Sequence, residues 1–542
     1  MTDYTKLRTP FLNMSFTPDV PSNALGPNEY NSGLNVEADV RGIKKISGEQ
    51  EILSTIPNFP VFMDGGFRSG VQWVFIVATR DAFNRGYWYL ITDSSITNIT
   101  PGVGANPAAF LPNYTDNINI TTSWVGNVFF INDNLSAPMY LLTTATEIYL
   151  YDAAPDNFVW NYDIGVTATR AGFVRNFCSP NVGNILIAGN ITKDYASGGT
   201  VNYPTTVRWS QAFAGTGVPA TWVPTLNNVA NEQEIPVRGP IIDGFFLGGS
   251  FYVCSYWDTV VFSPIAYQTS TAPVFGIRLM NQGRGLINNN CWSNTDSNVY
   301  GLDSRDIWIF DGTNFNPLGN QKVRDYFYAN LSDTYSDRVF MVNNTQKNQI
   351  EIYYPDQSST GWCNKMLSWR YDLQLWNAPK DVAFACDACE APKFVNGAFK
   401  YASRTVTYAR AGVANTKLVQ TGVGNSFINN QPIPTLFERT NMVLQTQNGP
   451  VPYSSKVYIH RVLPEIAGSG VISITVGSSN STAQTPTYGQ VGVVNVVTDT
   501  PWVTTQQNSG RTNSVKVESN NATDAWNLTA LNWQASIVED AF

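Results

Sequence analysis

The residues of this chain with the clearest chemical potential are two cysteines in a C-x-x-C arrangement, Cys386 and Cys389. This spacing serves redox chemistry in thioredoxin-like proteins and can supply half of a tetrahedral zinc site. Redox use would need a βαβ setting, and zinc would need a second cysteine or histidine pair; the sequence offers neither. The pattern therefore predicts free structural thiols. We expect the same of the remaining cysteines, Cys178, Cys254, Cys291 and Cys363.

Histidine is the residue on which general acid–base catalysis and nucleophilic triads most often depend. The sequence has one histidine, His460, which precedes Arg461 in a run of alternating apolar and polar residues. No Gly-x-Ser-x-Gly motif or comparable nucleophile motif accompanies it. Because no triad partner can be named, we expect a structural histidine.

Paired carboxylates are the second source of hydrolytic chemistry, since glycoside hydrolases use two of them. The densest acidic cluster among the predicted strands comprises Asp303, Asp306 and Asp311. Asp311 and Gly312 form a strong turn signal, and the other two carboxylates flank the start of a strand, so turn chemistry accounts for all three. The sequence also lacks a Walker phosphate loop and a dinucleotide fingerprint. We therefore predict no enzyme, no catalytic residues, no cofactor and no metal.

Basic residues are scattered, and no run reaches four consecutive cations. Arg278, Arg284, Lys322 and Arg324 could face DNA or a partner subunit, but surface ion pairs are the more ordinary use of such positions. The net charge is −8, so the general surface should not grip a nucleic-acid backbone. Only 14% of the residues are charged, against roughly 25% in an average protein. A surface poor in charge favours contacts between subunits.

The elements that must position these residues are strands. Short runs with strand periodicity, such as 71–78, 86–91, 251–256 and 306–310, are separated by Gly, Asn, Asp and Pro. One helix is predicted near 321–331. No stretch of 18 or more apolar residues exists, and the start lacks the apolar run of a signal peptide, so we expect no membrane span and synthesis in a cytoplasm.

The strand runs recur at a spacing of roughly 40 to 60 residues, which is close to the period of propeller blades. The sequence thus predicts an all-β fold, an irregular β-propeller followed by a C-terminal β-sandwich. We expect an N-terminal arm or ring-closing strand, a propeller, a linker or exposed loop, and the sandwich. The corresponding ranges are 1–60, 61–403, 404–434 and 435–542.

Several short segments in the middle of the chain form an ordered set. They are 208–210, 222–224, 231–236, 240–243, 251–256, 283–286, 306–312, 323–327, 351–355, 363–371 and 375–376. This set resembles the tail tubular protein B family, the tail nozzle proteins of short-tailed bacteriophages (podophages). The C-terminal segments 510–517 and 526–528 are similar to the last sandwich of many phage tail hub proteins. The resemblance covers roughly 60–530, and the chain is shorter than the largest family members.

The resemblance implies a non-enzymatic structural subunit of the virion tail. Family members form a six-fold ring below the head-to-tail adaptor, and the ring extends and gates the channel through which the genome is ejected. The expected partners are further copies in a hexamer, the adaptor protein, tail fibres, and DNA that passes without sequence-specific binding. Six copies at −8 each would carry −48, and acidic walls would keep DNA from adhering.

Two alternatives stay open at this point. A carbohydrate-binding or carbohydrate-degrading β-propeller, such as a receptor-binding tail component, would also be rich in aromatic residues, because sugars stack on Trp and Tyr. It predicts a glycan ligand and, if it degrades glycans, a pair of close carboxylates. A capsid decoration or scaffold protein is the other alternative, and it would not need a propeller.

Overall fold

The computed structural model describes nearly the whole chain, as strands with very little helix. Within the described residues, no helix is long and apolar enough to cross a membrane. The all-β prediction is confirmed. The described residues are 5–102, 111–116, 118–152, 158–180, 182–215, 217–265, 274–446, 449–497 and 502–539.

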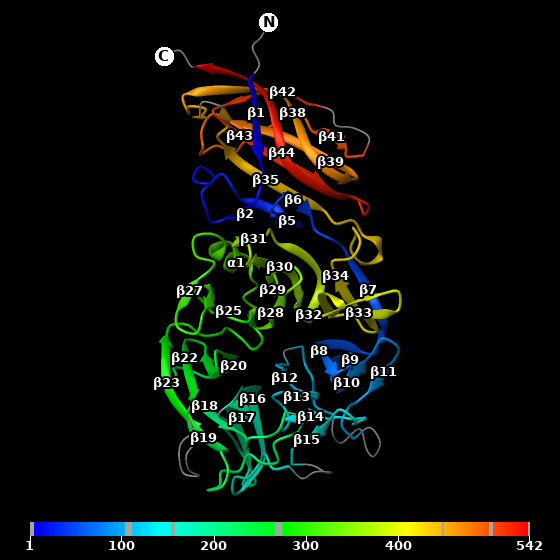
Figure 1. Cartoon of the computed structure of the whole chain (residues 1–542), viewed down its shortest axis with the longest axis vertical. Helices are drawn as coiled ribbons and strands as arrows, with labels where there is room; N and C mark the ends of the chain where they lie inside the picture. Colours follow the sequence, from blue (N-terminus) through cyan, green and yellow to red (C-terminus); the bar gives the residue numbers. More distant parts are fainter. Residues whose placement is uncertain are drawn as a thin grey trace.

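Seven four-stranded groups lie around one axis in the larger body of the molecule (Figure 1). In each group the strands are antiparallel, and in the first six groups they follow the chain outward from the axis. The first group contains β8 (Phe59–Arg68), β9 (Gln72–Arg80), β10 (Gly86–Ile91) and β11 (Ile96–Asn98). The second contains β12 (Thr121–Val125), β13 (Val128–Asn132), β14 (Met139–Leu141) and β15 (Tyr149–Leu150). The third contains β16 (Val166–Ser179), β17 (Gly183–Tyr195), β18 (Thr200–Trp209) and β19 (Asn231–Glu234).

The remaining groups continue the same order around the axis. The fourth contains β20 (Ile241–Leu247), β21 (Ser250–Ser255), β22 (Asp258–Pro264) and β23 (Phe275–Gln282). The fifth contains β24 (Trp292–Asn294), β25 (Val299–Leu302), β26 (Ile307–Phe310) and β27 (Phe315–Pro317). The sixth contains β28 (Phe340–Asn344), β29 (Gln349–Tyr354), β30 (Cys363–Arg370) and β31 (Leu375–Trp376). The seventh contains β32 (Lys380–Val395), β33 (Ala398–Arg410), β34 (Thr416–Thr421) and β7 (Glu49–Ile56), and the β30–β32 ladder joins it to the sixth.

The innermost strands close a ring. The strand pairs β12–β16, β16–β20, β24–β28, β28–β32 and β32–β8 are in contact, and side-chain hydrogen bonds link β8 to β12 and β20 to β24. Successive small sheets that bury their faces against their neighbours are the architecture of a β-propeller. The outermost strand of the seventh blade is β7, which comes from before the first blade and pairs with β34. The N-terminal part of the chain therefore fastens the ring.

The second body contains two six-stranded sheets, to which both ends of the chain contribute. One sheet contains β42 (Val503–Gly510), β38 (Ser455–Ser469), β44 (Ala525–Glu539), β6 (Gly42–Lys45), β5 (Val36–Asp39) and β1 (Thr5–Pro10). The other contains β4 (Ser32–Leu34), β35 (Thr435–Met442), β43 (Thr512–Ser519), β39 (Val471–Ser479), β40 (Thr487–Tyr488) and β41 (Gly492–Asn495). Two small pairs complete the strands, β2 (Ser15–Phe16) with β3 (Glu29–Tyr30) and β36 (Gln445–Thr446) with β37 (Gly449–Pro450).

The two bodies share one apolar core. Phe16 and Tyr30 of the N-terminal segment contact each other at the junction, and Tyr30 also packs on Phe437 of β35. The same cluster of buried residues continues into Trp376 and Phe327 of the propeller. Because this contact is apolar and continuous, the second body is fixed on the propeller.

The predicted helix is present but shorter than expected. It is α1 (Arg324–Asn330), flanked by the 3-10 turn η2 (Ser336–Arg338) further along the chain. Asp19 of the N-terminal segment accepts hydrogen bonds from the backbone N–H groups of Asp325 and Tyr326, both at 2.8 Å. The first turn of the helix is thus capped by a distant part of the chain.

The linker prediction for 404–434 is wrong in its first half. Residues up to Arg410 belong to β33, β34 follows, and only the segment after Thr421 is irregular, with the short 3-10 turn η3 (Ile428–Asn430). The Gly- and Asn-containing segment 411–415 is the turn between two paired strands. Residues 405–408 are β-branched or aromatic and so favour a strand, but the Gly- and Asn-containing turn beside them led to the linker prediction.

Candidate functional site

The axis of the propeller is crossed by a hydrogen-bond network centred on Arg175 of β16. Its Nε and Nη2 donate to the two carboxylate oxygens of Asp243 on β20, at 2.9 and 2.6 Å. Nη2 also donates to Asn290 Oδ1 at 2.7 Å, and Nη1 donates to the carbonyl oxygen of Thr122 on β12 at 2.9 Å. One guanidinium therefore connects three blades and the loop before a fourth.

Asp243 is fully buried and needs these donors. Trp292 Nε1 on β24 donates to its Oδ2 at 2.8 Å, and the backbone N–H of Asn290 donates to the same oxygen at 3.2 Å. The Arg175 guanidinium also lies over the Trp292 ring, 5.3 Å from its centroid. These hydrogen bonds fix the orientation of both side chains of the buried ion pair. Removing one partner would leave the charge of the other uncompensated.

Two further carboxylates lie near this ion pair, on the neighbouring strands β8 and β32. Asp64 accepts a hydrogen bond from Thr122 Oγ1 at 2.6 Å and one from the Gly65 N–H at 2.7 Å. Burial raises the pKa of Asp64, and it raises the pKa of Asp387 well above its ordinary value. The Asp64 carboxylate contributes to the shift at Asp387, whereas Arg175 opposes it. The environment of Asp387 therefore favours its protonated form more than water does.

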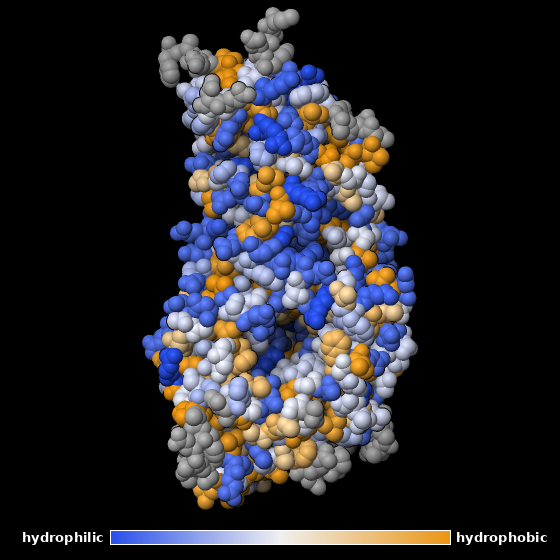
Figure 2. Space-filling model, viewed as in Figure 1, coloured by the Kyte–Doolittle hydropathy of each residue, from blue (hydrophilic) through white to orange (hydrophobic). Residues whose placement is uncertain are grey.

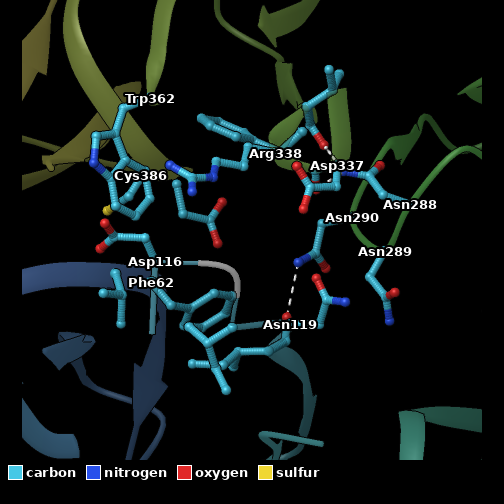
Figure 3. A pocket seen from close by; sticks show the side chains of 16 residues that line it. Phe62, Asp116, Asn119, Asn288, Asn289, Asn290, Asp337, Arg338, Trp362 and Cys386 are labelled. Carbon is cyan, nitrogen blue, oxygen red and sulfur yellow. Dashed lines mark hydrogen bonds between the residues drawn. The ribbon is translucent and has the colours of Figure 1, made fainter. Parts of the chain in front are cut away.

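A small cavity of about 50 Å³ lies at one mouth of the axis, where the space-filling view is hollowed (Figures 2 and 3). Such a volume holds a few water molecules at most. Its wall is rich in amide and carboxylate groups. The labelled lining residues are Phe62, Asp116, Asn119, Asn288, Asn289, Asn290, Asp337, Arg338, Trp362 and Cys386.

Several polar side chains around this cavity form ion pairs, cation–π contacts or hydrogen bonds with other protein groups. Asp116 pairs with Arg80 at 2.6 Å, and Arg338 lies between the rings of Tyr335 and Trp362 at 4.9 and 4.6 Å. Asn288 Nδ2 donates to the carbonyl oxygens of Asp337 and Val339, just before β28, at 2.5 and 2.8 Å. The arrangement holds the loops at the mouth together, and the space it leaves is too small for a sugar ring.

The two cysteines of the C-x-x-C motif lie on β32 beside this cluster. Burial raises the pKa of both thiols well above the ordinary value. Cys386 Sγ donates to the carbonyl oxygen of Ala409 at 3.4 Å, and both cysteines are free thiols. A thiol with a raised pKa forms less of the reactive thiolate and is a poorer nucleophile. Within the described residues, no group of three or more His, Cys, Asp or Glu side chains is placed to hold a metal ion.

The three predicted turn carboxylates occupy turns. Asp303 Oδ1 accepts from the N–H groups of Arg305 and Asp306 at 2.7 and 2.9 Å, while its Oδ2 pairs with Arg284 at 2.9 Å. Asp311 Oδ1 accepts from the N–H groups two and three residues onward, which lowers its pKa. Burial raises the pKa of Asp306, whose Oδ1 accepts from the next backbone N–H. Each carboxylate thus stabilises a local turn.

His460 lies far along the chain from this cluster, on β38 of the second body. Its Nε2 and Ser536 Oγ of β44 are 2.8 Å apart, so the bond connects two adjacent strands of one sheet. Of the basic residues considered from the sequence, Arg324 pairs with Asp325 at 2.9 Å, and Arg278 is exposed on the edge strand β23. Arg278 lies on β23, whereas Lys322 lies just before α1 and Arg324 is its first residue, so the three residues do not share one element.

The axial residues Asp64, Arg175, Asp243 and Asp387 were not identified from the sequence. A partial signal exists for three of them, because the short runs 62–67, 173–177 and 241–246 each contain one charged residue, at the third position. No such pattern marks Asp387, because β32 also contains Lys380, Asp381, Glu390 and Lys393.

Comparisons with known proteins add little to this geometry. No family model matches the chain, and no curated protein matches it. A solved structure described as "Structure of Dos1 propeller" is similar at a TM-score of 0.39 and 10% sequence identity, and the match covers 71% of this chain and 97% of that chain.

Proposed function

We propose that the chain is a structural subunit of a phage tail nozzle, which extends and gates the DNA ejection channel below the head-to-tail adaptor. The observation that carries the proposal is the order of the short segments that resemble the tail tubular protein B family. Those segments occupy strands of successive blades, for example 231–236 around β19, 306–312 around β26 and 363–371 around β30. Their order in sequence is therefore also their order around the ring.

The chemistry of the axis agrees with a structural role. The Arg175 network uses its polar groups to connect blades, and the cavity beside it is about 50 Å³. A DNA channel would therefore be formed between several copies, rather than along the axis of one propeller. The shared apolar core of the two bodies gives each copy a fixed shape, which a symmetric ring requires.

In this role the chain works in the virion tail after synthesis in the host cytoplasm. Its partners are further copies in a hexameric ring, the adaptor protein, and tail fibres as a further candidate. The genome passes without sequence-specific binding. The low proportion of charged residues suits contacts between neighbouring copies.

The test is the mass and symmetry of the purified protein, alone and mixed with phage heads that lack tails. A six-fold ring, free or formed only at the portal vertex of the head, is the expected result. A stable monomer or trimer that ignores heads and binds a cell-surface glycan would overturn the proposal in favour of a receptor-binding propeller. Binding all over the head surface would instead indicate a decoration protein.

A further inference from the structure

The hairpin formed by β32 and β33 is the longest pair of strands in the propeller, at 16 and 13 residues. Its turn is Asn396–Gly397, and both residues have positive φ, 52° and 79°. These are the conformations of a tight two-residue hairpin turn whose twist matches that of the strands. The end of the hairpin is thus an ordered structural feature rather than a loose loop.

The two faces of this hairpin differ in chemistry. Phe394 and Phe399 are directly opposite, with ring centroids 5.4 Å apart, and Phe399 packs on Phe75 of β9 at 5.9 Å. Because side chains alternate along a strand, the adjacent opposite pair, Lys393 and Lys400, lies on the other face. One face is bound to the propeller core, and the other presents two lysines.

The lysine pair is unusual for its position. Residues directly opposite on antiparallel strands have Cβ atoms about 5 Å apart, and like charges there are destabilising. Lys400 is exposed, Lys393 is half-buried, and neither has an ion pair or side-chain hydrogen bond with a described residue. By contrast, the nearby cation Arg404 on the same hairpin is paired with Glu390. The repulsion between the two lysines therefore has no internal compensation.

The hairpin is nevertheless held firmly. Phe394 N donates to Gln420 Oε1 at 2.5 Å, and Arg404 N donates to Gln346 Oε1 of the neighbouring blade at 2.7 Å. The ring of Tyr401 lies 5.7 Å from that of Phe67 at the end of β8. A rigid support lowers the entropy that the lysines would lose on binding an external group.

From this geometry we propose that the β32–β33 hairpin is the surface through which the chain contacts the phosphate backbone of double-stranded DNA. The inference rests on the proposed nozzle function and names the contact within it. Two adjacent, unneutralised ammonium groups are complementary to closely spaced phosphates and carry no base-reading geometry. In a ring of six copies they would supply twelve lysines in an otherwise acidic assembly, enough to position DNA without holding it tightly.

The experiment measures binding of a fluorescent DNA duplex of about 30 base pairs to the full-length protein, by anisotropy from about 20 to 200 mM salt. Wild type is compared with K393Q/K400Q and with the control K6Q/K417Q, which removes two exposed lysines elsewhere and changes the net charge equally. K393R/K400R keeps the charge. The mass of each protein, alone and on tailless heads, is determined on the same preparations.

The expected result is salt-sensitive binding by wild type, the control and K393R/K400R, with at least tenfold weaker binding by K393Q/K400Q at low salt. The slope of log affinity against log salt should fall by about 2 in that variant, which corresponds to two lost phosphate contacts. An unchanged slope, equal loss in the control, or no wild-type binding at the lowest salt would overturn the inference.

Two outcomes separate this inference from the proposed function. If six-fold rings form on heads but K393Q/K400Q binds DNA like wild type, the hairpin inference fails and the nozzle function stands. If the hairpin variant loses DNA binding but no ring ever forms, the nozzle function fails. Loss of the ring with unchanged DNA binding in K393Q/K400Q would show that the lysines contact an acidic face of a second copy, which also overturns the inference.

Discussion

Lys347, in the turn between β28 and β29, donates through Nζ to Glu37 Oε2 of β5 at 3.0 Å, and so joins the propeller to the second body. Lys44 of β6 lies 3.3 Å from the other oxygen of Glu37. Burial alone would raise the pKa of Glu37, but the two lysines outweigh it and lower the pKa to about 2. The junction between the bodies therefore contains a charge pair as well as an apolar core.

Replacing this carboxylate should destabilise the junction. A carboxyl whose folded pKa is lowered contributes stability above its unfolded value of about 4.5, and that contribution is lost as the pH falls toward 2. We expect Glu37→Gln to cost about 3 kcal/mol at pH 7 and to flatten the loss of stability between pH 5 and pH 2. Denaturant titrations at several pH values measure both. Glu518→Gln is the control, since its pair with Lys516 is solvent-exposed and should be worth under about 1 kcal/mol; equal effects of the two changes would contradict the interpretation.

Compared with replacing Glu37, replacing Asp387 should have the opposite effect on stability. Its folded pKa is raised, so the folded state keeps a proton that the unfolded chain releases, and stability falls as the pH rises from about 4 toward neutrality. Asp387→Asn should therefore raise the thermal midpoint at pH 7 and weaken this dependence. Asp243→Asn, which removes the charge opposite Arg175, should lower the midpoint instead. A lower midpoint for both variants would contradict a raised pKa at Asp387.

Arg175 should be the most sensitive position on the axis. Arg175→Met keeps much of the side-chain volume but removes hydrogen bonds to three parts of the ring and leaves Asp243 buried without a cation. The expected cost is about 3 to 5 kcal/mol, measured by denaturant unfolding. Arg278→Met, at an exposed position on β23, should stay within about 0.5 kcal/mol of wild type. Similar values for the two would show that the axial network contributes little.

The cysteines should differ sharply in reactivity. Cys178 is exposed, whereas burial raises the pKa of the other five thiols, to about 12 at Cys291. Because the thiolate is the reactive form, a disulfide reagent at pH 8 should modify about one thiol per folded chain quickly and the remainder only on unfolding. Cys178→Ser should abolish the fast phase. A fast equivalent that remains in that variant would show that another thiol, such as those of the C-x-x-C motif, is accessible after all.

The sequence was informative where local rules apply. Strand periodicity located most blade strands, and the turn residues Asp303 and Asp311 were recognisable because their hydrogen bonds reach only two or three residues along the chain. The axial cluster could not be located in this way. Arg175 and Asp243 are 68 residues apart, and Asp387 is still more distant, so their proximity depends on closure of the ring. The available clue was one charged residue in each of the short runs around Asp64, Arg175 and Asp243.

The contribution of the N-terminal segment was similarly hidden. Its strands are short, and β1, β4 and β6 have partner strands 400 or more residues away, a distance that the contact of Arg8 with Glu465 also spans. Local patterns can indicate that such a segment is extended, but the partner strand is chosen by tertiary packing. For the same reason, the apolar residues that join the two bodies could not be assigned to either body beforehand.

The pairing of β1 with β44 has a consequence for the order of events at the ribosome. Residues 5–45 emerge long before their partner strands β35 and β44. Phe11, Phe16 and Tyr30 therefore remain without their final packing during most of translation. A chain that stopped before residue 525 would leave β1, and the edge of β6 that faces β44, without their partner strand. Incomplete products would therefore carry unpaired strand edges, which favour aggregation and recognition by chaperones.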